Sequence, residues 1–99
     1  MRPALYGAKH KIIPVNKKNK YSNKIYEFVG PICESTDKFL TVKKFQNLNE
    51  NELIIICDVG AYGSSLSSNY NLRSKPAEIL IKNSRIIIAK KRQKLRDFI

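Results

Sequence analysis

Six short runs of β-branched and aromatic residues, separated by polar or turn-forming segments, most constrain the fold of this chain. Runs of this kind are typical of β-strands. Their number and spacing favour an all-β domain, which we expect to be a small Greek-key barrel or sandwich with short helical turns. The expected strands cover residues 11–15, 25–29, 39–42, 53–58, 77–81 and 85–89.

Finer patterns predict how these strands are covered and connected. Residues 54–56 are three consecutive isoleucines, which indicates a strand covered on both faces. The segment 82–84 is typical of a three-residue hairpin loop. Pro3 can begin a helical turn, because the first turn of a helix does not need its N–H, and a second turn is expected within residues 61–69. The charged tail, residues 90–99, is interpreted as a frayed helix.

The length and charge of the chain limit its function. With 99 residues it can form one small domain, residues 1–99, with a modest core. Its net charge of +11, from 19 basic and 8 acidic residues, would attract phosphate backbones or acidic surfaces. A basic nucleic-acid-binding β-domain is therefore one candidate. The basic residues are scattered, however, and the aromatic residues form no stacking pattern, so we favour compositional drift over a nucleic-acid partner.

Cysteine and histidine usage argues against disulfide and metal sites. Cys33 and Cys57 are too few for a disulfide scaffold and lack metal-ligand spacing. The single histidine, His10, is interpreted as structural, and we expect no metal ligands. The chain has no signal-peptide pattern at its start and no apolar run of membrane-spanning length. We therefore expect a cytoplasmic protein without a membrane partner.

The segment Gly-Pro-Ile-Cys-Glu-Ser, residues 30–35, places a thiol beside a carboxylate after a Gly-Pro turn. A thiol of tuned pKa can act as a proton donor, and the carboxylate can bind an ammonium group. Taken alone, Cys33 and Glu34 favour a plainer interpretation, in which a buried cysteine precedes a solvated glutamate.

Three further residues could contact an anion. Tyr62 lies in a segment flanked by glycines, and its phenol could donate a hydrogen bond to a phosphate or carboxylate oxygen, although it could equally be a core tyrosine. Arg2 and Tyr6 are four residues apart, so along a helical turn they would share a face and could together bind one carboxylate. The alternative for this pair is a frayed N-terminus.

Four strings together resemble the C-terminal β-domain of the diaminopimelate decarboxylases. These enzymes are a branch of the ornithine/diaminopimelate/arginine decarboxylase family, which depends on pyridoxal 5′-phosphate (PLP). The resemblance follows the chain in order over nearly its whole length, and Glu34 after the cysteine favours the diaminopimelate branch. The strings are Met-Arg-Pro-Ala-Leu-Tyr-Gly-Ala at 1–8, Gly-Pro-Ile-Cys-Glu-Ser at 30–35, Asp-Val-Gly-Ala-Tyr-Gly at 58–63 and Ser-Ser-Asn-Tyr-Asn at 67–71.

The resemblance implies a role for each candidate residue. Cys33 would be the catalytic proton donor and Glu34 a substrate contact, both reaching across a homodimer interface into the partner's active site. Arg2 and Tyr6 would bind substrate, and Tyr62 would contact both substrate and PLP. The full enzyme would convert meso-diaminopimelate to L-lysine and carbon dioxide.

The resemblance also implies what this chain lacks. The PLP-binding TIM barrel and its anchoring lysine are expected outside it, so the chain is expected to be a fragment or separately encoded part that is inactive alone. The first strand of the family's β-domain is also expected to be missing, which would leave a sheet edge open. A non-catalytic domain that docks on a full-length homologue remains the other alternative.

Overall fold

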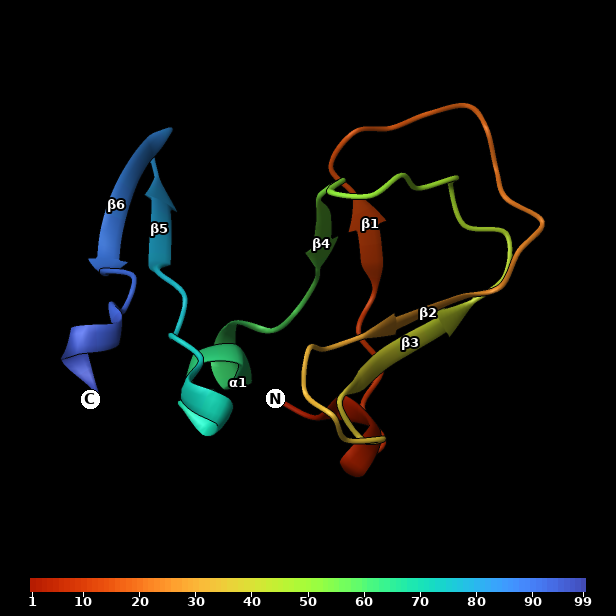
Figure 1. The fold of residues 1–99 in the computed structure, drawn as a ribbon. Coiled ribbons are helices and arrows are strands. Elements are labelled where there is room, and N and C mark those ends of the chain that lie inside the picture. The colour runs from red at the N-terminus through yellow and green to blue at the C-terminus, as the bar shows by residue number, and fades with distance from the viewer. The chain divides into compact units, whose positions relative to one another are not determined.

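The computed structural model describes all 99 residues, which divide into two compact units, Met1–Val59 and Gly60–Ile99. The first unit contains the 3₁₀ helix η1 (Pro3–Leu5) and four strands, and the second contains the other two strands and three short helices (Figure 1). The strands of the first unit are β1 (Ile12–Pro14), β2 (Tyr26–Val29), β3 (Lys38–Val42) and β4 (Ile54–Ile56). The second unit comprises α1 (Gly60–Ser65), η2 (Tyr70–Leu72), β5 (Glu78–Lys82), β6 (Arg85–Lys90) and η3 (Leu95–Asp97).

Every strand expected from the sequence is present, with ends within two residues of the expected ones. The strands form three antiparallel pairs, β1–β4, β2–β3 and β5–β6. The chain is thus strand-rich with few, short helices, as expected. None of these helices has the length and apolar character needed to cross a membrane.

The β1–β4 pair corrects one expectation. The middle isoleucine of β4, Ile55, is 45% exposed, whereas we expected both faces of this strand to be covered. β4 pairs only with β1, and successive side chains of a strand point to opposite faces. The partner strand buries Ile12, which lies opposite Ile56, so the covered face is the one that carries Ile56 and Ile54.

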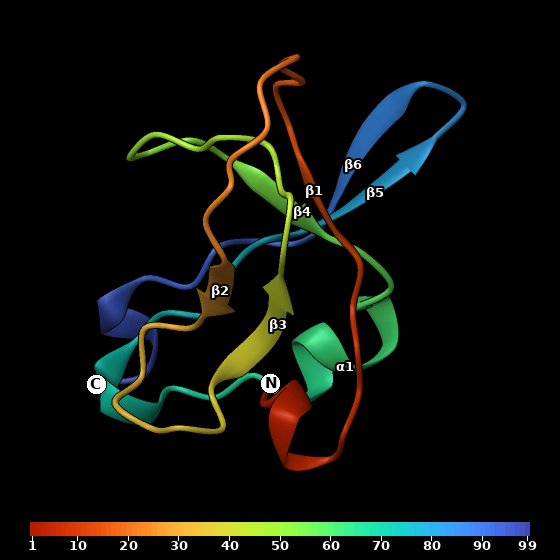
Figure 2. The same cartoon turned by 90° about the vertical axis from the view of Figure 1, so that its right-hand side faces the viewer.

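The β2–β3 pair supplies the aromatic part of the core. Tyr26 and Phe28 alternate along β2, so both point to the same face, and each contacts the ring of buried Phe45. The ring centroids of Phe28 and Phe45 are 5.0 Å apart in an edge-to-face arrangement, which is favourable for aromatic pairs. In Figure 2, β2 and β3 run side by side, and the red turn of η1 lies at the lower end of β3, consistent with the contacts between η1 and β3.

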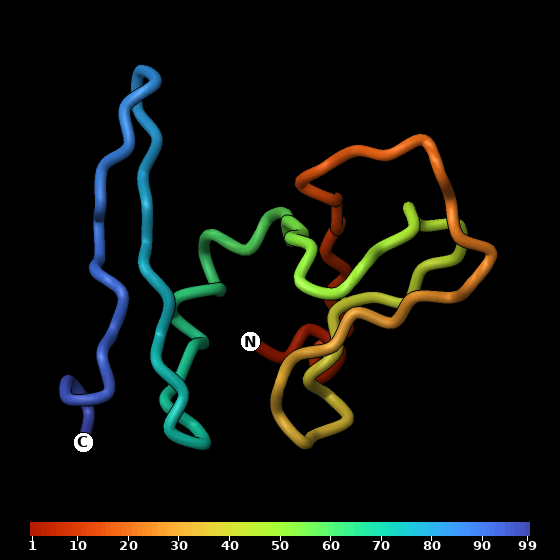
Figure 3. Tube along the Cα trace, turned by 45° about the horizontal axis from the view of Figure 1, so that its top comes forward, coloured from red at the N-terminus to blue at the C-terminus, as the bar shows by residue number.

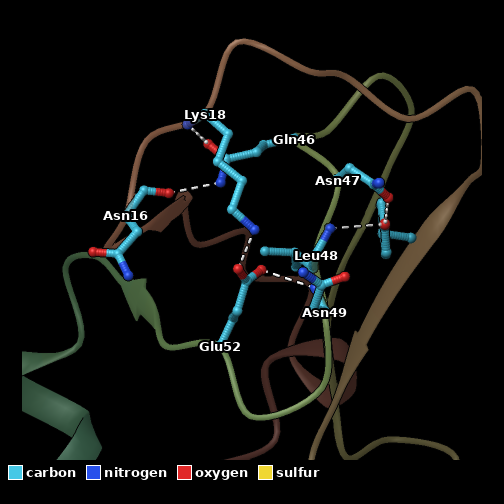
Figure 4. A network of polar contacts seen from close by, with 8 residues as sticks. Asn16, Lys18, Gln46, Asn47, Leu48, Asn49 and Glu52 are labelled. Atoms are coloured by element: carbon cyan, nitrogen blue, oxygen red, sulfur yellow. Dashed lines mark hydrogen bonds and ion pairs between the residues drawn. The ribbon is translucent and has the colours of Figure 1, made fainter.

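The side chain of a buried glutamine links the segment between β3 and β4 to the segment between β1 and β2 (Figure 4). Gln46 is only 6% exposed. Its side-chain oxygen accepts a hydrogen bond from the Lys18 backbone N–H at 2.7 Å, and its side-chain nitrogen donates to the Asn16 carbonyl at 2.6 Å. The Lys18 ammonium donates to Glu52, whose other oxygen accepts from the Asn49 backbone N–H at 2.8 Å. The oxygen and the nitrogen of the Gln46 side-chain amide therefore each have a hydrogen-bond partner, as a buried amide requires.

The second unit contains the β5–β6 hairpin, the blue arm of the trace in Figure 3. Lys82 pairs with Arg85, so the loop has two residues, Asn83 and Ser84, and not the three that we expected. Both loop residues have positive φ (49° and 61°), the combination that a type I′ turn requires and that matches the twist of the flanking strands. The tail forms only the short η3, and β6 extends to Lys90.

Candidate functional site

The loop of residues 30–37, which joins β2 to β3, carries Cys33 and Glu34 (the orange-to-yellow turn at the base of this pair in Figure 1). Both residues are exposed, so the structure contradicts the alternative in which Cys33 is a buried core cysteine. The register of the β2–β3 pair shifts where Phe28 pairs with Leu40 and Val29 pairs with Lys38, so the extra residue, Phe39, lies on β3 just after this loop. An extra residue of this kind bends the strand that carries it and increases the local twist, here at the start of β3.

Asp37, at the end of the loop, forms hydrogen bonds with residues earlier in the same loop. Its carboxylate oxygen accepts a hydrogen bond from the Ile32 backbone N–H at 2.9 Å, although the residue is only 7% exposed. Its carbonyl accepts from the Gly30 N–H at 2.8 Å, and its own N–H donates to the Glu34 carbonyl at 3.1 Å. Asp37 thus contacts residues along the whole loop that bears the thiol and the carboxylate.

Gly30 fits this loop because it has no side chain. A Cβ atom at this position would lie 2.0 Å from Asp37 Oδ2 and 2.3 Å from Asp37 Cγ. Atoms that are not bonded to each other do not approach so closely, so the Asp37 carboxylate occupies the space that any larger residue would need. The glycine of the Gly-Pro pair is required here for close approach of a side chain.

Arg2 and Glu34, two of the candidate substrate contacts, meet in this unit. Arg2 Nη1 donates to Glu34 Oε1 at 2.7 Å, and both side chains keep substantial exposure. The Thr36 hydroxyl donates to the same carboxylate oxygen. A guanidinium group and a carboxylate of opposite charge therefore lie together at the surface, 32 residues apart in the sequence.

These contacts lower the pKa of Glu34. The hydrogen bond from Thr36 lowers this pKa most, followed by the hydrogen bond from Arg2; desolvation opposes them, and the positive charge of Arg2 lowers the pKa least. Donors and positive charge favour the ionised form of a carboxyl group. Glu34 is consequently a carboxylate at neutral pH, the form that can bind a cation.

The geometry predicted for Tyr6 differs from the observed one. We expected Arg2 and Tyr6 to share a face along a helical turn, but the helical segment is the three-residue η1, a 3₁₀ helix. Arg2 and Tyr6 flank it with φ of −130° and −114°, outside helical values. In a 3₁₀ helix it is residues three apart that align, so four-residue spacing does not bring these side chains to one face. Tyr6 remains exposed at the surface.

Tyr62 lies in the second unit, in α1. Its side chain is 64% exposed, so it is not the core tyrosine of the alternative interpretation. α1 leads into hydrogen-bonded turns at Leu66 and Ser67, whose N–H groups donate to the Tyr62 and Ser64 carbonyls at 3.0 Å. The phenol hydroxyl is therefore accessible for donation to an external oxygen.

A hydrogen bond between His10 and Cys57 links the segment before β1 to the segment after β4. His10 Nδ1 lies 3.0 Å from the Cys57 carbonyl oxygen. A carbonyl can only accept, so Nδ1 carries the proton in this contact. This role agrees with the structural interpretation of His10. No group of three histidine, cysteine or acidic side chains that could hold a metal ion is present.

Sequence reasoning missed Asp37 and Thr36 as determinants of this site, and it identified Gly30 only as part of a Gly-Pro turn. The signal available in the sequence was the position of Asp37, an acidic residue directly before β3 and seven residues after a glycine. Its burial could not be read from that position, because aspartate is one of the residues least often buried. Its carboxylate acquires its partner, the Ile32 N–H in the same loop, only when the segment between β2 and β3 turns back on itself.

The fold and the loop chemistry define a strand-rich protein with few, short helices, in which a thiol and a carboxylate are exposed at one strand connection. Residues 1–60 match the family described as the pyridoxal-dependent decarboxylase, C-terminal sheet domain. The chain belongs to this family.

Named relatives agree with this assignment. The chain is 37% identical over 97 residues to the diaminopimelate decarboxylase of Haemophilus influenzae and 36% identical over 99 residues to that of Archaeoglobus fulgidus. A solved diaminopimelate decarboxylase from M. jannaschii, in co-complex with L-lysine, matches 97% of the chain with 33% identity and a TM-score of 0.86. The chain spans 23% and 24% of the two curated relatives and 22% of that solved chain, so it corresponds to under a quarter of each.

Proposed function

We propose that this chain acts as the C-terminal sheet domain of a diaminopimelate decarboxylase, which converts meso-diaminopimelate to L-lysine and carbon dioxide. The observation that carries the proposal is the surface loop of residues 30–37, which presents the Cys33 thiol beside the ionised Glu34 carboxylate in a family that is pyridoxal-dependent. Similarity to diaminopimelate decarboxylases over nearly the whole chain supports this substrate.

The residues of this chain can supply acid and binding groups. The exposed Cys33 thiol can donate a proton to the substrate carbon that has lost carbon dioxide. The Glu34 carboxylate can bind a substrate ammonium group, and the Arg2 guanidinium can bind a substrate carboxylate. Tyr6 is assigned to substrate binding as well, through a contact separate from that of Arg2, with its exposed phenol as a hydrogen-bond donor.

PLP supplies an electron sink for the decarboxylation when it is bound. The residue of this chain that suits contact with it is Tyr62, because its exposed phenol can donate to an anionic oxygen. The chain contains no PLP-anchoring lysine motif, and it matches only the C-terminal sheet domain of the family. We therefore assign the anchoring lysine to a barrel domain outside this chain, and the Greek-key closure of the sheet to strands supplied by the complete enzyme.

The proposal includes a second subunit. Cys33 and Glu34 are assigned to the active site of the partner in a homodimer, which their exposure on a connecting loop permits. The second alternative, a non-catalytic domain that docks on a full-length homologue, shares the fold and differs only in whether a barrel partner exists.

Complementation in trans tests the proposal. The chain is mixed with the barrel part of a related diaminopimelate decarboxylase, and lysine formation from meso-diaminopimelate is measured with added PLP. We expect activity from the mixture that rises with concentration, and none from either piece alone, because association replaces a covalent linker.

Two cysteine variants make the test specific. Cys33→Ala is expected to lower turnover by about 10²–10⁴-fold, the usual contribution of a positioned proton donor, while assembly is retained. Cys57→Ala is the matched control and should stay near the unmodified chain. Pieces that associate, bind PLP and yet form no lysine at any concentration would exclude the catalytic role and leave the docking alternative.

A further inference from the structure

Asp37 is a buried acidic side chain in a loop whose functional residues are exposed. It is 7% exposed, whereas Cys33, Glu34 and Ser35 all lie at the surface. Burying a carboxylate is costly unless it receives hydrogen bonds, and here the Ile32 N–H donates to it at 2.9 Å. A group held in place against this cost calls for a specific explanation.

The hydrogen bonds of Asp37 are distributed along the loop. The carbonyl accepts from Gly30 at the start, the carboxylate accepts from Ile32 before Cys33, and the N–H donates to the Glu34 carbonyl. In addition to these three bonds, the Glu34 N–H donates to the Ile32 carbonyl at 2.8 Å. Cys33 therefore lies between Ile32 and Glu34, and each of these two neighbours is hydrogen-bonded to Asp37.

We propose that Asp37 is a positioning residue, whose buried carboxylate holds the 30–37 loop in the one conformation that presents Cys33 and Glu34. The proposal rests on the proposed function for the roles of those two residues. Asp37 does not contact substrate. It acts through the backbone of Ile32, and the side-chain-free Gly30 leaves the space that its carboxylate occupies.

This arrangement matters because proton transfer depends steeply on geometry. Misplacement of a reacting group by about 1 Å can cost 10²-fold in rate. A loop of eight residues that projects from a two-stranded sheet has many conformations of similar energy unless internal contacts select one. Two side-chain contacts are internal to this loop, and the bond from the Ile32 N–H to the buried residue Asp37 is the less exposed of them, since the bond from Thr36 to Glu34 lies at the surface.

Amide hydrogen exchange on the full chain tests the positioning role directly. Asp37→Ala removes the acceptor of the Ile32 N–H, and we expect exchange of this amide to accelerate at least about fivefold, the effect of one net hydrogen bond. Asp37→Asn keeps an acceptor oxygen of the same shape and should retain most of the protection. The internal controls are the Val15 and Cys57 N–H groups, which donate to the Leu53 and Lys11 carbonyls and should not change.

Activity of the complemented enzyme provides the second readout. Asp37→Ala should lower kcat by about 10-fold or more with assembly intact, and Asp37→Asn should restore most of it. Unchanged Ile32 exchange in Asp37→Ala would overturn the proposal, as would equal acceleration of the Val15 and Cys57 amides, which would indicate general unfolding. If the proposed function fails, the unmodified chain gives no turnover while the exchange result stands, so the two failures can be told apart.

Discussion

Arg2 Nη1 and Glu34 Oε1 lie 2.7 Å apart and form an ion pair across 32 residues of sequence. The first residue lies just before η1 and the second lies in the loop between β2 and β3. In the proposed enzyme, Arg2 binds a carboxylate and Glu34 binds an ammonium group. In this chain each charge is satisfied by the other, so a substrate that carries both groups could replace the pair without leaving a charge unpaired.

The ion pair predicts a specific pH response. The pKa of Glu34 lies below its ordinary value of 4.5, so the interaction stabilises the fold above that pH and is lost as pH falls through the lowered folded-state pKa. Arg2→Gln and Thr36→Val should each raise the pKa of Glu34, because each removes a donor to its carboxylate.

Carbon-13 NMR titration of the glutamate carboxyl groups measures this change. Glu52 is the matched control, since its pKa is lowered by Lys18 and by the Asn49 N–H, which neither variant alters. A Glu34 titration curve that is the same in Arg2→Gln and in the unmodified chain would show that the pair does not persist in solution.

The two thiols are expected to differ in reactivity toward iodoacetamide. Cys33 is exposed on the 30–37 loop, whereas Cys57 is partly buried and its N–H is bonded to the Lys11 carbonyl at 2.8 Å. Accessible thiols react faster than covered ones, so Cys33 should be labelled first under native conditions. Peptide mass spectrometry identifies the labelled site, and denaturant serves as the control because it should equalise the two rates. Faster labelling of Cys57 would contradict the assigned strand packing.

Gly30→Ala is expected to destabilise the first unit by about 1–3 kcal/mol, because the new methyl group would overlap the Asp37 carboxylate. In an Asp37→Ala background the same change should cost less than about 0.5 kcal/mol, since the obstructing group is gone. Urea unfolding of the four chains gives the coupling energy.

Gly60→Ala is the control for this double-mutant cycle of Gly30 and Asp37. Nothing lies within 4 Å of a Cβ at Gly60, which begins α1, and alanine is the better helix former. Gly60→Ala should therefore be neutral or slightly stabilising. Additive costs for Gly30→Ala and Asp37→Ala would mean that these residues do not compete for the same space.

Gln46→Glu is expected to destabilise the chain by about 1–3 kcal/mol, because it removes the donor to the Asn16 carbonyl and places a carboxylate oxygen there (Figure 4). Gln93→Glu is the matched control. The Gln93 side-chain oxygen accepts from the Asn69 side chain and from the Lys75 N–H at 2.9 Å, while its nitrogen has only a 3.5 Å contact. A carboxylate preserves those acceptor roles, so thermal unfolding should shift much less. Equal shifts for the two variants would contradict the assigned orientation of Gln46.

The sequence alone determined the strands of this protein and the residues worth testing. Runs such as 25–29 and 85–89 predicted β2 and β6 because alternation of side chains and β-branched composition act over a few neighbouring residues. Pro3 predicted the start of η1 for the same local reason. The strings at 30–35, with Cys33 and Glu34, and at 58–63, with Tyr62, indicated a decarboxylase domain through resemblance. The family match confirms that the chain is a decarboxylase sheet domain.

Tertiary structure decided which side chains are covered and which meet. Ile55 is exposed because it points to the opposite face of the β1–β4 pair from buried Ile12, and Asp37 is buried where it bonds to the backbone of its own loop. The hairpin loop has two residues because the register pairs Lys82 with Arg85. Arg2 reaches Glu34 through the packing of η1 against β3. Local composition encodes backbone hydrogen-bonding periodicity, but burial and long-range pairing depend on strand register and on which segments cover each face, and these are set only when distant parts of the chain come together.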